Sequence, residues 1–142
     1  QWILNDINAC GGNWEAVRDG RPALPIELMV AYLYDLIGRG NPVGLFGMVN
    51  VLEGTSIALA TQAAGTIQST LDLPDKAFSY LSSHGALDQD HMVTYRNLMN
   101  RLDDPADQQA VIHASKVVYR LYTEMFQSLP RTGQPEVHHA FV

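Results

Sequence analysis

The sequence predicts an all-α protein built from several helices of ordinary length. Apolar residues recur at three- and four-residue spacings, helix-starting caps and prolines precede them, and no strand, hairpin or repeat pattern competes. The 142 residues suffice for one domain with a single core. We therefore expect one helical domain over residues 1–129. Residues 130–142 lack periodicity and are expected to form a loose tail.

The first elements follow from glycine and proline positions. A helix is expected over residues 1–9 and is ended by Gly11-Gly12, because glycine accepts the left-handed conformation that closes a helix. A short turn follows at residues 14–17. Pro25 is a favoured first-turn residue and opens a helix to about Arg39. Its apolar residues follow helical spacing: Ile26, Met29, Val30, Leu33, Leu36 and Ile37.

Asn41-Pro42 is a cap before a first-turn proline, and it opens a long helix to about Thr70. Glu53 is its only charged residue between positions 43 and 67. The length would suffice for a membrane span, but polar residues are spread through the segment. We expect instead a central, fully surrounded helix. Its small residues would allow neighbouring helices to approach closely: Gly44, Gly47, Gly54, Ala58 and Gly65.

The second half of the chain predicts two more helices. One reaches about Leu102, with a break or bend near Ser82-Ser83. The next begins where Asp104 precedes Pro105, which is the clearest helix start in the sequence. Its apolar stripe consists of Val111, Ala114, Val118, Leu121 and Met125.

The charge and the cysteine content limit the classes of binding partner and the cell compartment that we expect. Nine Lys and Arg against fifteen Asp and Glu give a net charge of -6, and the basic residues are scattered. Binding to nucleic acid needs a concentrated positive face, so no nucleic-acid partner is expected. The single Cys10 cannot form an internal disulfide, and no signal peptide heads the sequence. We expect a cytoplasmic protein without membrane association.

A cluster of metal-binding residue types occurs in the helix before Leu102. His84, Asp88 and His91 are spaced i, i+4, i+7, which places them within roughly 60° on one helix face. Two imidazoles and one carboxylate can bind iron, manganese or zinc and leave positions open. Asp90 projects to another side. The neighbours Leu87, Tyr95 and Leu98 lie near the same face, so we expect it to be more buried than exposed.

Glu53 points to the same chemistry from the long apolar helix. A carboxylate in apolar surroundings is costly unless it is paired, protonated or bound to a metal. An ion pair with an arginine such as Arg96 is the structural alternative. Together with the cluster on the other helix, Glu53 predicts a metal held inside a helix bundle.

The sequence resembles the haem-oxygenase-like diiron oxidases and oxygenases in two places. These are residues 51–56 (VLEGTS) and residues 80–84 (YLSSH) with their continuation through Asp88 to His91. These proteins are often labelled iron-containing redox enzymes and share their helical bundle with the TenA and PqqC-like proteins. In the family, one core helix gives a Glu and a His, the second a Glu, and the third a His-x3-Asp-x2-His set. Glu53 matches the second-helix ligand, and His84, Asp88 and His91 match the third.

The resemblance implies two non-haem irons, with manganese as another metal that fits, and an oxidoreductase that activates dioxygen on a small organic substrate. Haem is not expected, and a homodimer is compatible with the fold. The first-helix Glu and His should lie before Trp2, and the opening residues resemble the end of that helix. We therefore expect that N-terminal helices of the fold precede this sequence.

The sequence is also compatible with two other functions. A metal-free helical binding or structural protein of the same fold would need arginine partners or shared protons at Glu53 and the His84 face. A phosphohydrolase of the His-Asp type is disfavoured, since Asp90-His91 has the reverse order. One remaining histidine is expected at the surface, and the two in the tail match no spaced metal motif. Core packing is the expected use of the tyrosines, with the lining of a substrate cavity as the alternative. The histidines are His113, His138 and His139, and the tyrosines are Tyr95, Tyr119 and Tyr122.

Overall fold

The computed structural model of this protein describes residues 2–130, apart from the side chains of residues 84–90. The described chain forms helices and no strand, which confirms the predicted all-α class. The predicted tail after Pro130 lies outside the described residues. In chain order the α-helices and two short 3-10 helices are α1 Trp2–Ala9, α2 Trp14–Asp19, α3 Leu24–Arg39, η1 Pro42–Gly44, α4 Leu45–Leu71, η2 Asp75–Phe78, α5 Ser79–Met99 and α6 Pro105–Gln127.

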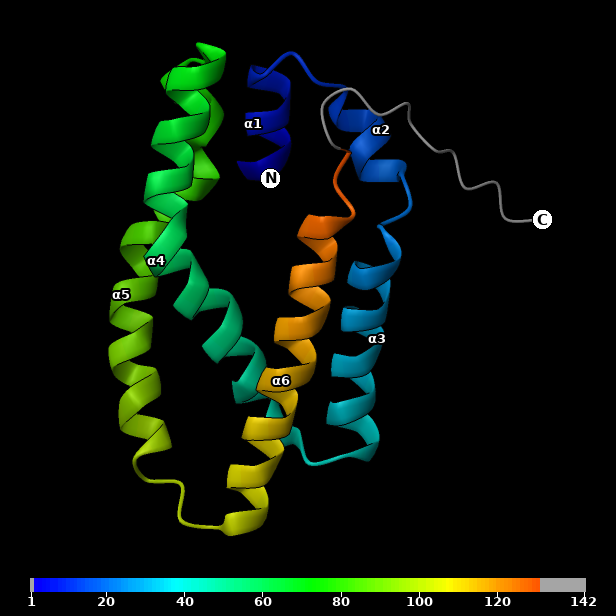
Figure 1. Cartoon of the computed structure of the whole chain (residues 1–142), viewed down its shortest axis with the longest axis vertical. Coiled ribbons are helices and arrows are strands. Elements are labelled where there is room, and N and C mark those ends of the chain that lie inside the picture. The colour runs from blue at the N-terminus through cyan, green and yellow to red at the C-terminus, as the bar shows by residue number, and fades with distance from the viewer. Residues whose placement is uncertain (1, 131–142) are drawn as a thin grey trace, which may run out of the picture.

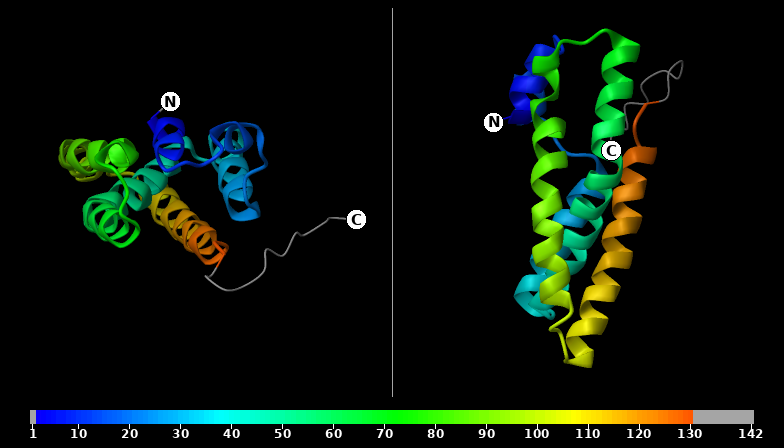
Figure 2. Two further views of the ribbon diagram at one scale, coloured as in Figure 1. Left: turned by 90° about the horizontal axis from the view of Figure 1, so that it is seen from above. Right: turned by 90° about the vertical axis from the view of Figure 1, so that its left-hand side faces the viewer.

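Three long helices form the body of the bundle, with α4 between α5 and α6 (Figure 1). α3 packs against α6, and α1 packs against η2 and α5. α4 and α5 run side by side in opposite directions, joined by the turn that contains η2 (Figure 2). This arrangement gives α4 two long partners, one on each side.

Local capping explains where several helices begin and end. Gly11 has a φ of 79°, as predicted for the residue that stops α1. The predicted turn after it is instead the short helix α2, because the Asn13 side chain accepts a hydrogen bond from the Ala16 amide. Asp104 caps α6 in the same way through the Ala106 amide, as its sequence predicts.

The tightest packing lies where α4 crosses α6. A Cβ atom added to Gly47 would lie 2.5 Å from the Ser115 amide nitrogen, so the two backbones are in contact there. Ala114 and Val118 on α6 have no exposed surface. Val118 belongs to a core cluster with Met29 and Val51, which brings α3, α4 and α6 together. The predicted apolar stripe of α6 is therefore the buried face.

The prediction that α4 is fully surrounded is wrong. Its buried residues are only Gly47, Val51, Ala60 and Ala64. α5 and α6 cover two sides of this helix, and the sides between them stay open. Gly54 and Gly65 have no neighbour within 4 Å of an added Cβ, so they do not provide the close approach predicted for them.

The same helix meets the length and composition criteria for crossing a membrane. The segment Pro42–Leu71 is long and apolar enough, and 22% of its most apolar window is buried in the protein. The core helix of a water-soluble bundle can meet these criteria too. The absence of membrane association stays a prediction.

α5 begins at a contact with the start of the chain. Asp6 is buried in α1 and accepts hydrogen bonds from the Ser79 hydroxyl and, at 2.7 Å, from the Tyr80 amide. These donors belong to the first turn of α5, where amides lack partners within the helix. The helix is continuous through Ser82 and Ser83, so the predicted break there is wrong. The Ser83 hydroxyl donates to the Ser79 carbonyl and leaves the helix intact.

Candidate metal centre

Glu53 of α4 and His91 of α5 face each other across the contact between these helices. Glu53 Oε2 lies 3.6 Å from His91 Nδ1. This distance is longer than a hydrogen bond but short enough for both atoms to bind one metal ion. The structure thus brings together one predicted residue from each helix.

The carboxylate of Glu53 is only partly accessible to solvent. Its side chain is 29% exposed, yet its Oε2 atom is buried and has no hydrogen-bond donor. No ion pair between Glu53 and Arg96 occurs among the described side chains. Burial of an ionised oxygen without a donor is unfavourable, so this atom calls for a cation.

His91 is more accessible than the sequence predicts. Its side chain is 57% exposed, and Leu98 near the same helix face is also exposed. The expectation of a mainly buried face is therefore wrong for these two residues. α5 packs mainly against α4, with smaller contacts to α1 and η2. A small molecule can approach His91 from solvent.

The remaining predicted ligands belong to α5 as well. The helix is continuous from Ser79 to Met99, but the side chains of His84, Asp88 and Asp90 lie outside the described residues. Among the side chains that the structure does describe, no group of three His, Cys, Asp or Glu residues could hold a metal ion. The described part of the site is the pair Glu53 and His91.

A cavity of about 510 Å³ lies among α4, α5 and α6, and neither Glu53 nor His91 lines it. Asn50 comes from α4, Tyr95 from α5 and Lys116 from α6. Burial raises the pKa of the Tyr95 hydroxyl above its ordinary value, so this group stays protonated and can donate a hydrogen bond. Sequence reasoning considered Tyr95 but missed Asn50 and Lys116, because only the helix arrangement brings them together.

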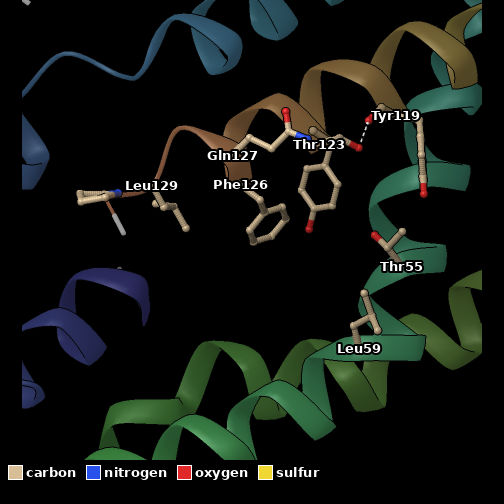
Figure 3. Close-up of a pocket in the computed structure, with 9 residues that line it drawn as sticks. Thr55, Leu59, Tyr119, Thr123, Phe126, Gln127 and Leu129 are labelled. Carbon is tan, nitrogen blue, oxygen red and sulfur yellow. Dashed lines mark hydrogen bonds between the residues drawn. The ribbon is translucent and has the colours of Figure 1, made fainter. Parts of the chain in front are cut away.

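A second cavity, of about 470 Å³, lies between α4 and the end of α6 (Figure 3). Thr55 and Leu59 of α4 line one side, and Tyr119, Tyr122 and Phe126 of α6 line the other. Thr55 follows Glu53 by two residues and so projects about 200° away from it around the helix. This cavity therefore belongs to the opposite side of α4 from the Glu53 and His91 pair.

Comparison with models of protein families identifies the family of this chain. The model of the iron-containing redox enzymes, a haem-oxygenase-like family, matches residues 1–123. The chain is a member of the iron-containing redox enzyme family. This confirms the resemblance seen in the sequence and, at the level of the family, a redox function with iron. Searches of curated proteins and of solved structures find no match.

Proposed function

We propose that this iron-containing redox enzyme is a non-haem iron oxidoreductase that oxidises a small organic substrate with dioxygen. The iron would lie between α4 and α5. The proposed ligands are Glu53, His84, Asp88 and His91. A two-iron centre, as the resemblance implies, needs more donors than these four, and the resemblance assigns a Glu and a His of a further helix to it.

The observation that supports the site most is the buried Oε2 atom of Glu53, which has no hydrogen-bond donor. A metal cation would compensate for its lost hydration. Two donor atoms that bind one ion at about 2.1 Å lie about 3 to 3.5 Å apart. The 3.6 Å between Glu53 Oε2 and His91 Nδ1 needs little adjustment to meet that range.

His84 and Asp88 enter the proposal through helical spacing. The backbone of α5 is helical from residue 84 to residue 91, so positions i, i+4 and i+7 share one side of it. A neutral imidazole and a carboxylate are ligands that iron accepts, and a set of this kind leaves coordination positions open. Asp90 stands about 100° away from His91 around the helix and is not included.

The chain's own residues have separate tasks in this proposal. Bound iron would supply the redox chemistry and the site of dioxygen reduction. Glu53 contributes a negative charge from the apolar helix, where its poor hydration strengthens the attraction for a cation. His91 is more than half exposed, so a substrate can reach it from solvent. Tyr95 keeps its proton in the lining of the cavity among α4, α5 and α6 and can hold a polar group of the substrate.

Iron binding by matched variants tests this proposal. The protein is loaded anaerobically with ferrous iron and desalted, and its metal content and iron affinity are measured. We expect Glu53→Gln and His91→Ala to weaken iron binding by more than about tenfold, since each loses a ligand. Glu27→Gln and His113→Ala, at exposed positions on α3 and α6, should bind iron as the unchanged protein does.

Two results would contradict the proposal. Equal iron binding by all four variants would show that Glu53 and His91 are not ligands. An unchanged protein that takes up neither iron nor manganese would favour the metal-free helical binding protein. Circular dichroism of each variant confirms that it is folded before its metal content is compared.

A further inference from the structure

A third cavity lies where α1 meets the end of α4, η2 and the start of α5, at the end of the bundle opposite the link between α5 and α6 (Figure 1). Its volume of about 560 Å³ falls within the usual range for small-molecule sites. Leu81 in its wall precedes His91 by ten residues on α5, and Ile67 follows Glu53 by fourteen on α4. These steps correspond to about 15 and 21 Å of helix, so the cavity is separate from the Glu53 and His91 pair.

The walls of this cavity are mostly apolar. Two aromatic side chains belong to them, the buried Phe78 of η2 and the half-buried Tyr80 of α5. Most of the other wall residues are aliphatic and come from α1, α4 and α5: Ile3, Ile7, Ile67 and Leu81. Such walls suit the carbon skeleton of a ligand, and the faces of aromatic rings also attract a cation.

The charge of the cavity comes from α1. Among the described residues that line it, Asp6 is the only charged one, and it is 8% exposed. Its carboxylate accepts hydrogen bonds from the Ser79 hydroxyl and the Tyr80 amide, which are both neutral donors. No ion pair of Asp6 occurs among the described side chains. A carboxylate can accept about four hydrogen bonds, so Asp6 keeps its charge and part of its acceptor capacity for a cation.

From this arrangement we infer that the cavity binds a small organic amine in its protonated form. The ammonium group pairs with the Asp6 carboxylate, and the apolar walls hold the carbon skeleton. An anionic ligand is disfavoured by the charge of Asp6, by the lack of Lys and Arg in the described lining and by the net charge of -6. The inference does not depend on the proposed iron site, because neither Glu53 nor His91 lines this cavity.

Binding of a matched pair of probes to the metal-free protein tests the inference. The probes are 4-phenylbutylamine and 4-phenylbutan-1-ol, which differ in charge but little in shape, and calorimetry measures both affinities at neutral pH. We expect the amine to bind at least about tenfold more tightly than the alcohol, the size of one charged hydrogen bond. Asp6→Asn should remove this preference. Its amide can keep both hydrogen bonds without a charge, because its oxygen accepts from the Tyr80 amide and its NH₂ group donates to the Ser79 hydroxyl.

Two further variants separate the charge from the fold. Asp103→Asn removes the same charge from an exposed residue in the link between α5 and α6, and it should leave the preference for the amine unchanged. Ile67→Lys leaves the hydrogen bonds of Asp6 intact and adds a positive charge to the cavity wall at an exposed position. It should weaken amine binding by at least about tenfold and alcohol binding much less, because only the amine is repelled.

Cys10 reports where the amine binds. It is the only cysteine of the chain, is exposed and lines the cavity. Saturating 4-phenylbutylamine should therefore slow the reaction of its thiol with iodoacetamide several-fold. The same concentration of the amine should protect Cys10 much less in Asp6→Asn.

Three results would overturn the inference. They are equal binding of both probes, an equal loss of the preference in Asp6→Asn and Asp103→Asn, and a reaction of Cys10 that the amine does not slow. The inference and the iron proposal fail separately, since amine binding is measured without metal and iron uptake is measured without amine. Iron uptake that depends on Glu53 and His91, without a preference for the amine, would refute only the amine site.

Discussion

The two sides of α4 are built differently. Toward α6, Gly47 lets the backbones touch, and Ala114 and Val118 are fully buried. Toward α5, Glu53 Oε2 lies 3.6 Å from His91 Nδ1 and is buried without a hydrogen-bond donor. Stability and chemistry are thus divided between two contacts of one helix, which we call the α6 seam (α4 with α6) and the α5 seam (α4 with α5). Changes at the α6 seam should alter the free energy of unfolding, and changes at the α5 seam should alter metal binding.

The largest effect is expected at Gly47. Gly47→Ala would place a methyl group 2.5 Å from the Ser115 nitrogen and 2.6 Å from the Val111 carbonyl oxygen, so α4 and α6 must separate. We expect a loss of about 3 kcal/mol in the free energy of unfolding, measured by urea denaturation.

Gly65 on the same helix is the matched control. An added methyl group would meet nothing within 4 Å, and glycine is a poor helix former. Gly65→Ala should therefore stabilise the protein by about 0.5 to 1 kcal/mol. The same sign for both substitutions would show that α4 and α6 are not in backbone contact.

Val118 tests the packing of this seam with a smaller change. Its side chain is fully buried in the cluster with Met29 and Val51, so Val118→Ala leaves a cavity there. We expect a loss of about 2 kcal/mol in unfolding free energy. Val30→Ala on the exposed side of α3 removes the same atoms and should cost less than about 0.5 kcal/mol.

The α5 seam should respond in the opposite direction. In the metal-free protein, Glu53→Met replaces a poorly hydrated carboxylate by an apolar side chain of similar length. We expect unfolding to become about 1 kcal/mol more costly, while iron binding is lost. Thermal unfolding with and without ferrous iron measures both effects. A destabilised metal-free variant would mean that Glu53 has a structural partner. It would contradict the assignment of stability to the α6 seam alone.

The smallest effect concerns Tyr32, which packs against the α3, α4 and α6 core. Its buried hydroxyl has no hydrogen-bond partner, and burial raises its pKa above the ordinary value of 10.0. As pH rises past that value, the unfolded chain loses this proton first, so stability is lost in alkali. Tyr32→Phe should raise the free energy of unfolding by up to about 1 kcal/mol, and the variant should lose less stability above pH 10.

Tyr34 on the same helix serves as the control. It is 75% exposed, so Tyr34→Phe should leave both the stability and its dependence on pH nearly unchanged. Urea denaturation at neutral and alkaline pH distinguishes the two variants. Equal behaviour would indicate that the Tyr32 hydroxyl is hydrated in solution.

Local signals predicted the helices well, and packing explains the misses. The cap at Asp104 and the left-handed Gly11 depend on a few neighbouring residues, so the sequence shows them directly. The surroundings of α4 depend on how many helices reach it, which no local pattern contains. The intact start of α5 depends on Asp6, a residue distant in the sequence.

The candidate site divides in the same way. The apolar neighbours of Glu53 predicted an unusual carboxylate, and the structure places its buried oxygen near His91. The roles of His84, Asp88 and His91 as ligands stay predictions. Lys116 could not be predicted because an isolated lysine on an amphipathic helix looks like any solvated residue. Only the arrangement of three helices places this residue in the lining of a cavity.

The hydrogen bonds of Asp6 give the first eight-residue helix an importance beyond its size. They join it to α5 across 73 and 74 residues of sequence, and the exposed Gly11-Gly12 link separates it from everything that follows. A single protease cut at this link would leave the proposed ligands of α5 on one fragment and Asp6, which binds the first turn of that helix, on the other. After such a cut only the contacts of α1 with η2 and α5 would keep Asp6 at the first turn of α5, so the hold on that turn would become a binding equilibrium between two fragments.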